Sequence, residues 1–391
     1  MFSTLLLLAV ILGVLVLAHE WGHFWTARKL GVTAEEFGFG FPPRIVGFYK
    51  GADGKRKWIW GNREIEEEVR QRKETVYSIN WIPLGGFVKI KGEDGGEEKA
   101  SDSFSSQKIW KRFVILSAGV LMNFVLAGGL FFLAFYNGVP EIVEENYSGE
   151  DAKVQIVQVA RKSPAEEGGV KMGDEVVAFQ TAEGDLIAIK TVEEFQELVK
   201  KSAGQSVSLV LKNIQGERKI EVAIRSTAPE GEGLLGVVLA KTAIKEYGFW
   251  AALGMAIKSV FSLIGAILFF LKDLVVGIFS SSSKVSSDVA GPVGIAVMTG
   301  QVAQLGWTYL FQFAAMLSVN LGVINFLPLP ALDGGRALFL LIEKIKGRPI
   351  SRKIEGYIHT AGFAFLLGIM VLVTVKDFSR FEIITKLKNL F

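Results

Sequence analysis

The chain opens with MFSTLLLLAVILGVLVLAHEWGHFW, in which an apolar run over residues 2–18 leads directly into His19-Glu20-Trp21-Gly22-His23. At about 1.5 Å per residue, such a run as a helix crosses the ~30 Å hydrocarbon core of a bilayer. A cleaved secretory signal is the alternative interpretation. However, no Lys or Arg precedes the run, and the segment beyond a cut would itself be membrane-like. We therefore expect a retained membrane helix that carries a histidine motif.

The composition of the whole chain also indicates a membrane protein. Half of the 391 residues are hydrophobic and only 21% are charged, which leaves little polar surface for a soluble fold. Further apolar stretches of spanning length lie at about 113–136, 307–327 and 357–375. Residues 249–279 are also apolar, but Lys258 falls near their middle, where a charge costs about 2.5–3.5 kcal/mol. We expect about four transmembrane helices, with 249–279 as an amphipathic helix at the membrane interface.

Charge and residue counts exclude several classes of function. The net charge of +3, from 43 basic and 40 acidic residues, is too balanced for a nucleic-acid-binding protein. Cysteine is absent, which excludes disulfides, thiolate metal sites and a cysteine nucleophile. Histidine chemistry is confined to His19, His23 and His359.

The distribution of Lys and Arg predicts the orientation in the membrane. Basic residues are frequent in the loop of about residues 28–112 and between the third and fourth spans, so both should be cytoplasmic. The region of about 140–305 then lies outside. A full span at 249–279 would reverse the direction of the third span, which again favours an interfacial helix there.

The outer region reads as a small α/β insert over residues 152–225. Alternating patterns predict strands at 153–157, 206–212 and 219–224. A helix over 191–203 has Thr191 as N-cap, Glu194 three residues later, and Gly204 as its stop. The stretch SPAEEGGVKMGDEV at 163–176 resembles the signature of bacterial PDZ domains, and GLLGV at 233–237 resembles their carboxylate-binding loop. The alternative is an α/β insert with no ligand.

The motif at residues 19–23 is HExxH. Residues four apart share one face of a helix, so His19 and His23 can reach one metal ion, with Glu20 as general base. A pair of structural histidines is the alternative, but these polar groups are expensive inside a membrane helix. A catalytic zinc needs a third protein ligand. The candidates are His359 and Asp333, the latter in NFLPLPALDGG at 325–335, where two prolines break the helix.

HExxH in the first membrane helix together with NxxPxPxLDGG in the third resembles the site-2 protease family of intramembrane zinc metalloproteases. The inserted PDZ-like region makes the chain similar to the bacterial RseP-like branch, typified by the regulator of sigma-E protease, here with room for a single PDZ domain. The likeness covers nearly the whole chain and includes FGFGF at 37–41, PLGGFVK at 83–89 and GPVGI at 291–295. Residues 118–124, AGVLMNF, match the branch less well, because Val120 replaces its proline.

The resemblance implies one catalytic Zn²⁺ on His19, His23 and Asp333, with Glu20 as the base. It also implies that Asn325 contacts the substrate near the scissile bond. The stretch 75–90 resembles a hairpin that dips toward the membrane and presents an edge strand to an unwound substrate. Its substrate-binding residues would be Gly85, Gly86 and Phe87.

The expected architecture is a polytopic α-helical membrane protein with a membrane-associated β-hairpin or sheet and an inserted α/β PDZ domain. Residues 1–139 form the N-terminal membrane part of the protease core, and 140–240 form the extracytoplasmic PDZ domain. Residues 241–306 form an interfacial helical linker, and 307–391 form the C-terminal membrane part. The implied location is the bacterial plasma (inner) membrane, with the active site toward the cytoplasmic side.

The expected function is zinc-dependent hydrolysis of peptide bonds within or near transmembrane helices of substrate proteins. The family's usual substrates are anti-sigma factors and remnant signal peptides, and the PDZ domain would bind a peptide or a carboxyl terminus. A membrane-anchored zinc protease with a soluble active site is less consistent with a motif inside a hydrophobic helix. A PDZ-bearing scaffold or metal-binding protein without proteolysis is the other alternative, although such a protein has no use for Glu20.

Overall fold

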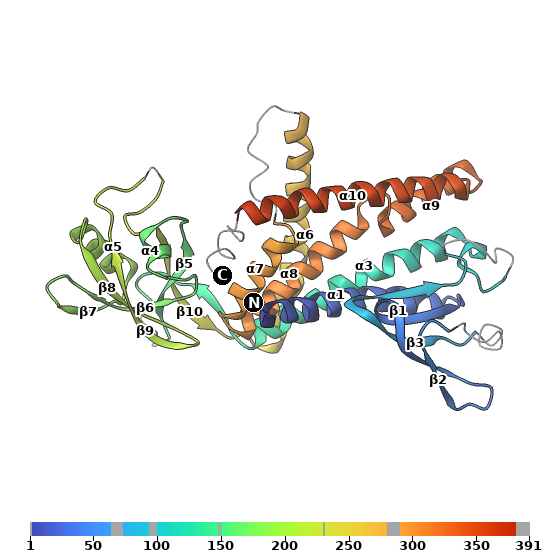
Figure 1. Cartoon of the computed structure of the whole chain (residues 1–391), viewed down its shortest axis with the longest axis horizontal. Helices are drawn as coiled ribbons and strands as arrows, with labels where there is room; N and C mark the ends of the chain where they lie inside the picture. Colours follow the sequence, from blue (N-terminus) through green and yellow to red (C-terminus); the bar gives the residue numbers. More distant parts are fainter. Residues whose placement is uncertain are drawn as a thin grey trace. The chain divides into compact units, whose positions relative to one another are not determined.

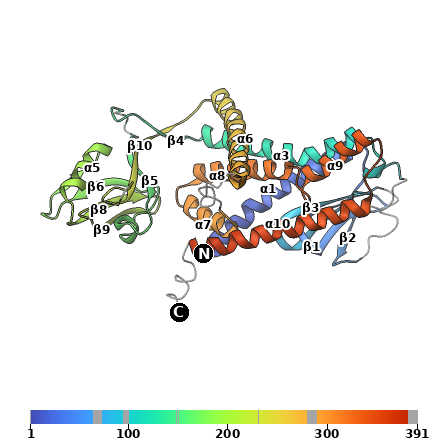
Figure 2. The same cartoon turned by 90° about the horizontal axis from the view of Figure 1, so that it is seen from above.

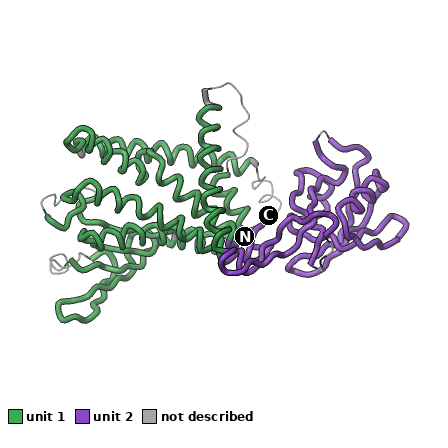
Figure 3. Tube along the Cα trace, turned by 180° about the vertical axis from the view of Figure 1, so that it is seen from behind, with its two compact units in different colours: residues 1–132, 253–300, 312–391 green, residues 133–252, 301–311 purple. Residues whose placement is uncertain are grey.

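The computed structural model describes residues 2–63, 73–93, 100–147, 149, 151–229, 231–279 and 290–380. The end of the expected C-terminal membrane part, 381–391, lies outside these residues. The chain divides into two compact units, which Figure 3 colours separately. Unit 1 comprises Met1–Phe132, Leu253–Gly300 and Gln312–Phe391, and unit 2 comprises Leu133–Ala252 and Gln301–Phe311.

Long apolar helices form the frame of unit 1. The stretches expected to span the membrane are α1 (Phe2–Lys29), α3 (Ile109–Tyr136), α8 (Trp307–Phe326) and α10 (Arg352–Arg380). Among the described residues a fifth candidate span of sufficient length and hydropathy is Phe249–Gly277, within α6 (Phe249–Phe279). Length and composition therefore admit five spans rather than four. In both Figure 1 and Figure 2, α6 runs across the direction of α1 and α10.

Small residues let α1 and α3 approach closely. A Cβ atom on Gly22 would lie 2.3 Å from the carbonyl oxygen of Ala118, so only glycine fits at this crossing. Such close contacts between small residues are typical of helices that pack in membranes. The contact sets α3 directly beside the segment of α1 that carries residues 19–23.

A three-stranded sheet lies against α1 and has the order β2-β1-β3. Its strands are β1 (Ala34–Lys50), β2 (Arg56–Trp60) and β3 (Val76–Ile90). Residues 36–39 of β1 pair on one side with 76–79 and on the other with 86–89, because β3 bends back on itself. Among the described strands, the second arm of β3 therefore forms one edge of the sheet, and β2 forms the other. The side chains of Trp58, Trp60 and Trp81 are more than 60% exposed.

Among the described residues, two further and shorter helices lie wholly or mostly in unit 1. They are α7 (Pro292–Ala303) and α9 (Asp333–Lys346), and a 3-10 turn at Phe104–Ser106 precedes α3. Helix α9 was not predicted from the sequence. Irregular backbone was expected around the prolines, and that part is only the short link between Phe326 and Asp333.

The described part of unit 2 is built around an antiparallel sheet with two short helices of its own. The strand order is β4-β10-β5-β6-β8-β9, with β7 pairing to β6. Its elements are β4 (Val139–Ile142), β5 (Lys153–Val159), α4 (Pro164–Glu167), β6 (Glu175–Gln180), β7 (Leu186–Ala188), α5 (Val192–Lys201), β8 (Ser206–Asn213), β9 (Gly216–Ala223) and β10 (Val237–Lys245).

The local predictions for unit 2 are confirmed. The three expected strands are β5, β8 and β9, each within a few residues of its predicted bounds. The Thr191 hydroxyl accepts from Glu194 N–H while the Glu194 carboxylate accepts from Thr191 N–H, which is the predicted capping box. Phe179 and Phe195 are almost fully buried at the centre of this unit's core.

Candidate active site

Three potential metal ligands meet in unit 1. His19 and His23 lie on one face of α1, both are about 95% buried, and their Nε2 atoms are 3.2 Å apart. Oδ2 of Asp333 lies 3.0 Å from the first of these nitrogens and 3.2 Å from the second. Of the two candidates for a third ligand, the structure thus brings Asp333 to the imidazoles, and it places His359 elsewhere.

The connection between α8 and α9 delivers Asp333 to this position. Pro328 and Pro330 prevent α8 from continuing, and the chain turns back through Ala331, whose φ is +76°. A Cβ atom on Gly334 would lie 2.2 Å from the Leu327 carbonyl oxygen, and one on Gly335 would lie 2.2 Å from that of Leu329. The two glycines therefore allow α9 to begin against the end of α8, with Asp333 in its first turn.

The spacing of the three donor atoms fits a zinc ion. Zinc binds His nitrogen and carboxylate oxygen at about 2.0–2.2 Å in tetrahedral geometry, which places neighbouring ligand atoms about 3.3–3.5 Å apart. The separations of 3.0, 3.2 and 3.2 Å are close to that value. Two imidazoles and one carboxylate also leave a fourth position open, as catalytic zinc sites require.

Helix α3 supplies contacts to the other side of both imidazoles. His23 Nδ1 lies 2.9 Å from the Ile115 carbonyl oxygen, and the amide of Asn123 lies 3.2 Å from His19 Nδ1. Sequence reasoning assigned no role to Asn123, although a buried amide in a membrane helix is itself a signal of function.

Glu20 connects the site to the sheet. Its Oε2 accepts a hydrogen bond of 3.0 Å from Val88 N–H, in the outer arm of β3. Gly85 and Gly86 are buried beside α1, where Cβ atoms on them would lie within 3.5 Å of Val16 and Leu17 respectively. Phe87 pairs with Gly38 of β1. The predicted substrate-binding residues thus lie on the edge strand that also contacts Glu20.

Asn325, near the end of α8, faces the candidate metal ligands. Its Nδ2 lies 3.4 Å from His19 Nε2, and the side chain is half-buried. An amide at this distance can contact a molecule that is bound at the open ligand position. The structure therefore brings Asp333 and Asn325 to the segment that carries residues 19–23, and it places Gly85 and Gly86 against the preceding turn of α1.

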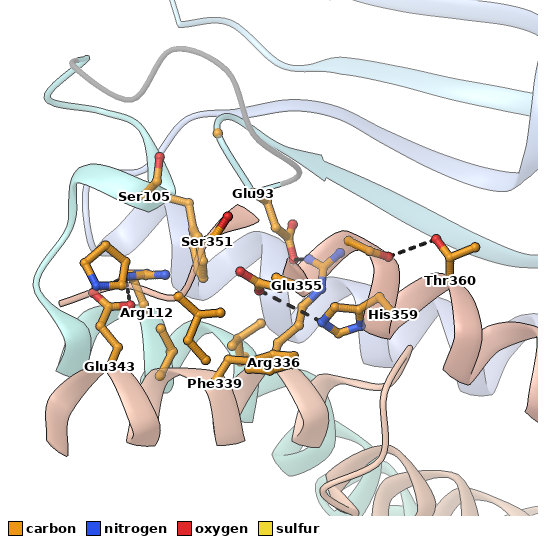
Figure 4. A pocket seen from close by; sticks show the side chains of 17 residues that line it. Glu93, Ser105, Arg112, Arg336, Phe339, Glu343, Ser351, Glu355, His359 and Thr360 are labelled. Atoms are coloured by element: carbon orange, nitrogen blue, oxygen red, sulfur yellow. Dashed lines mark hydrogen bonds and ion pairs between the residues drawn. The ribbon is translucent and has the colours of Figure 1, made fainter. Parts of the chain in front are cut away.

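A cavity of about 670 Å³ is lined by α9, the link from α9 to α10, and the starts of α3 and α10. Figure 4 shows the ion pairs at its walls: Arg112 Nη1 lies 2.9 Å from Glu343 Oε2, and Arg336 pairs with Glu93. His359 also lines it, and its Nδ1 accepts a 2.8 Å hydrogen bond from Ala331 N–H. This histidine thus supports the turn that precedes Asp333.

Comparison with known proteins identifies the family. The family described as peptidase family M50 matches residues 7–55 and 67–369. The chain belongs to peptidase family M50. The expectation of a peptidase is therefore confirmed.

Several named proteases resemble the chain over nearly their whole length. The regulator of sigma-W protease RasP of Bacillus subtilis is 29% identical over 459 residues, which cover 97% of this chain and 99% of the relative. The zinc metalloproteases RasP of Oceanobacillus iheyensis and Shouchella clausii are 28% and 29% identical, each with the same coverage. The region that matches the M50 family thus extends from the helix that carries HExxH to α10.

Proposed function

We propose that this M50 peptidase is an intramembrane zinc endopeptidase that cuts within or near transmembrane helices of other proteins. The observation that carries the proposal is that the donor atoms of His19, His23 and Asp333, among apolar helices, are spaced nearly as in a tetrahedral zinc site. The zinc named in the relatives suits this donor set. A scaffold without catalysis would not need Glu20 beside such a site.

The side chains around the proposed metal ligands would each have a separate role in peptide-bond hydrolysis. Zinc, when bound, polarises the scissile carbonyl and makes water more acidic. Glu20 accepts the proton of the attacking water and returns it to the leaving amine. Its hydrogen bond with Val88 N–H holds the carboxylate at the edge of the sheet. Asn325 would donate a hydrogen bond to the substrate near the scissile bond.

The outer arm of β3 is suited to hold the substrate in extended form. A peptide bond inside a helix is shielded by its own hydrogen bonds, so a substrate helix must unwind before hydrolysis. An edge strand can pair with the released backbone. Residues 85–87 lie on that edge, beside the Glu20 contact. The exposed Trp58, Trp60 and Trp81 of the same sheet are typical of a membrane interface.

Unit 2 is proposed to be a PDZ domain over residues 140–240 that binds an extended peptide. A groove of about 320 Å³ lies between α5 and the start of β10, and its lining includes Phe195, Val199 and Leu234. Strand β4 pairs only with Thr242–Lys245, so among the described strands none covers the other edge of residues 237–240. Pairing of a peptide with this edge would bring its side chains into the apolar groove.

The proposed topology has four spans in the bacterial plasma membrane, with unit 2 outside and the active site toward the cytoplasm. The crosswise direction of α6 supports an interfacial helix (Figures 1 and 2). The native chain has no cysteine, so single substitutions can be labelled with a membrane-impermeant maleimide. Trp250→Cys and Val276→Cys near the two ends of α6 should both react from outside. Labelling from opposite sides would show that α6 spans.

The catalytic proposal is tested with a model membrane substrate. Wild type should cleave it, Glu20→Gln should not, and both should hold one zinc ion per chain. Glu197→Gln, on the surface of α5, is the matched control and should cleave normally. Equal cleavage by Glu20→Gln would remove Glu20 from the mechanism. Zinc-loaded wild type that cuts no substrate would favour the scaffold.

The natural substrates are proposed to be membrane proteins such as anti-sigma factors or remnant signal peptides. The name of the Bacillus relative, a regulator of sigma-W protease, supports the first of these. Comparison of membrane-protein fragments in cells with wild type and with Glu20→Gln tests the assignment. Substrates should accumulate uncut only with the variant.

A further inference from the structure

Successive turns of α3 place three residues beside the imidazole pair. They are Ile115, Gly119 and Asn123, which are four residues apart and therefore share a helix face. The Ile115 carbonyl oxygen contacts His23 Nδ1, and the Asn123 amide contacts His19 Nδ1. Between them, Gly119 leaves space, because a Cβ atom there would lie 2.3 Å from His23 Nε2.

These contacts bear on which nitrogen of each ring can bind a metal. The Nε2 atoms face Asp333, so metal binding requires a lone pair on Nε2 and a hydrogen on Nδ1. For His23, the Nδ1–H donates to the Ile115 carbonyl oxygen, which can only accept. For His19, the corresponding partner is the side chain of Asn123.

The amide of Asn123 can serve His19 in one orientation. The structure places Nδ2 at 3.2 Å from His19 Nδ1 and leaves the buried Oδ1 without a hydrogen-bond partner among the described residues. The two atoms have nearly the same shape, and the hydrogen-bond network decides which of them faces a neighbour. With Oδ1 toward the ring, Asn123 accepts from Nδ1–H of His19 and leaves Nε2 free for the metal. With Nδ2 toward the ring, Nδ1 must accept, and the hydrogen moves to Nε2, where it blocks ligation.

The position of Asn123 is fixed by the surrounding helices. The residue is completely buried, and its backbone oxygen accepts a 2.8 Å hydrogen bond from Ser318 Oγ of α8. A fully buried amide inside a membrane helix is costly unless it has a polar partner. His19 Nδ1 is that partner.

We propose that Asn123 is a positioning residue that holds His19 in the zinc-binding tautomer by accepting a hydrogen bond from Nδ1–H. The proposal rests on the assignment of His19, His23 and Asp333 as zinc ligands. Partners of this kind typically change metal affinity by about 10- to 100-fold when they are removed.

Zinc affinity of the purified full-length protein, measured by competition with a chelator, tests the proposal directly. Asn123→Leu keeps the size of the side chain but removes the acceptor, and should weaken zinc binding by about 10- to 100-fold. Asn123→Asp keeps an acceptor oxygen and should bind zinc at least as tightly as wild type. Asn320→Leu is the control, because the Asn320 side chain donates to the Met316 carbonyl within α8 and, among the described residues, to no other group. Asn123→Ala repeats the test if the leucine variant does not fold.

The absorption spectrum of the cobalt-substituted protein gives a second readout. The spectrum of Asn123→Leu should shift, because the ring of His19 loses its fixed orientation, whereas that of Asn123→Asp should resemble wild type. Wild-type affinity and an unchanged spectrum in Asn123→Leu would overturn the proposal. Asp333→Asn tests the zinc-ligand assignment on which the proposal rests. If this variant binds zinc as tightly as wild type, that assignment is wrong.

Discussion

The space that Gly119 leaves beside the imidazoles can be tested by filling it. In Gly119→Ala the added carbon would lie 2.3 Å from His23 Nε2 and 2.8 Å from His19 Cε1. Carbon and nitrogen atoms pack at about 3.5 Å, so the ring or the helix must move by about 1.2 Å. Ligand distances in metal sites tolerate only about 0.2 Å. We expect zinc affinity to fall by more than about 100-fold, or more than about 2.7 kcal/mol.

The matched controls lie on the same helix. Cβ atoms on Gly128 and Gly129 would meet nothing within 4 Å, so alanine there should leave zinc binding unchanged. Alanine also favours a helix interior over glycine by about 0.8–1 kcal/mol, so these controls should not lose stability. Chelator competition gives the affinity, and thermal unfolding in detergent shows whether α3 has moved away from α1 instead. If Gly119→Ala matches both controls in affinity and in unfolding temperature, the described contact between α3 and the imidazoles is wrong.

Three further predictions concern other parts of the structure. His359→Ala removes the acceptor for Ala331 N–H, in the turn that precedes Asp333, and should lower zinc affinity several-fold. Unchanged affinity would show that this turn keeps its conformation without the hydrogen bond. Burial of Asp102 favours its neutral form, but the hydrogen bond from the Thr33 hydroxyl and nearby lysines outweigh this and hold its pKa below the usual value. Wild type should therefore unfold at a higher temperature than Asp102→Asn at pH 7. This difference in unfolding temperature should shrink only below about pH 4, because there the Asp102 carboxylate of the unfolded chain becomes protonated before that of the folded chain. Thr191→Ala removes the N-cap of α5 and should lower the unfolding free energy of unit 2 by about 1 kcal/mol, whereas Thr191→Ser should retain most of it.

Much of the site could be predicted because its first half is local. His19 and His23 are four residues apart, and the period of a helix alone places them on one face. The spans follow from length and hydropathy, and the capping box of Thr191 and Glu194 follows from neighbours within one turn. Each of these predictions depends on residues that are close in the chain, so the sequence was sufficient to make them.

The rest required distant segments to meet. The choice between Asp333 and His359 as third ligand depends on how the turn after α8 packs against α1, more than 300 residues away. No local pattern shows that Asn123 lies against His19, or that the outer arm of β3 reaches Glu20. Helix α9 was not predicted because it begins at a pair of glycines, and such a pair in sequence is typical of a turn. The sequence by itself determined the candidate ligand types, the candidate base and the long apolar helices. Only tertiary packing decided which side chains surround them, because contacts between distant segments depend on how helices and strands fit together in space.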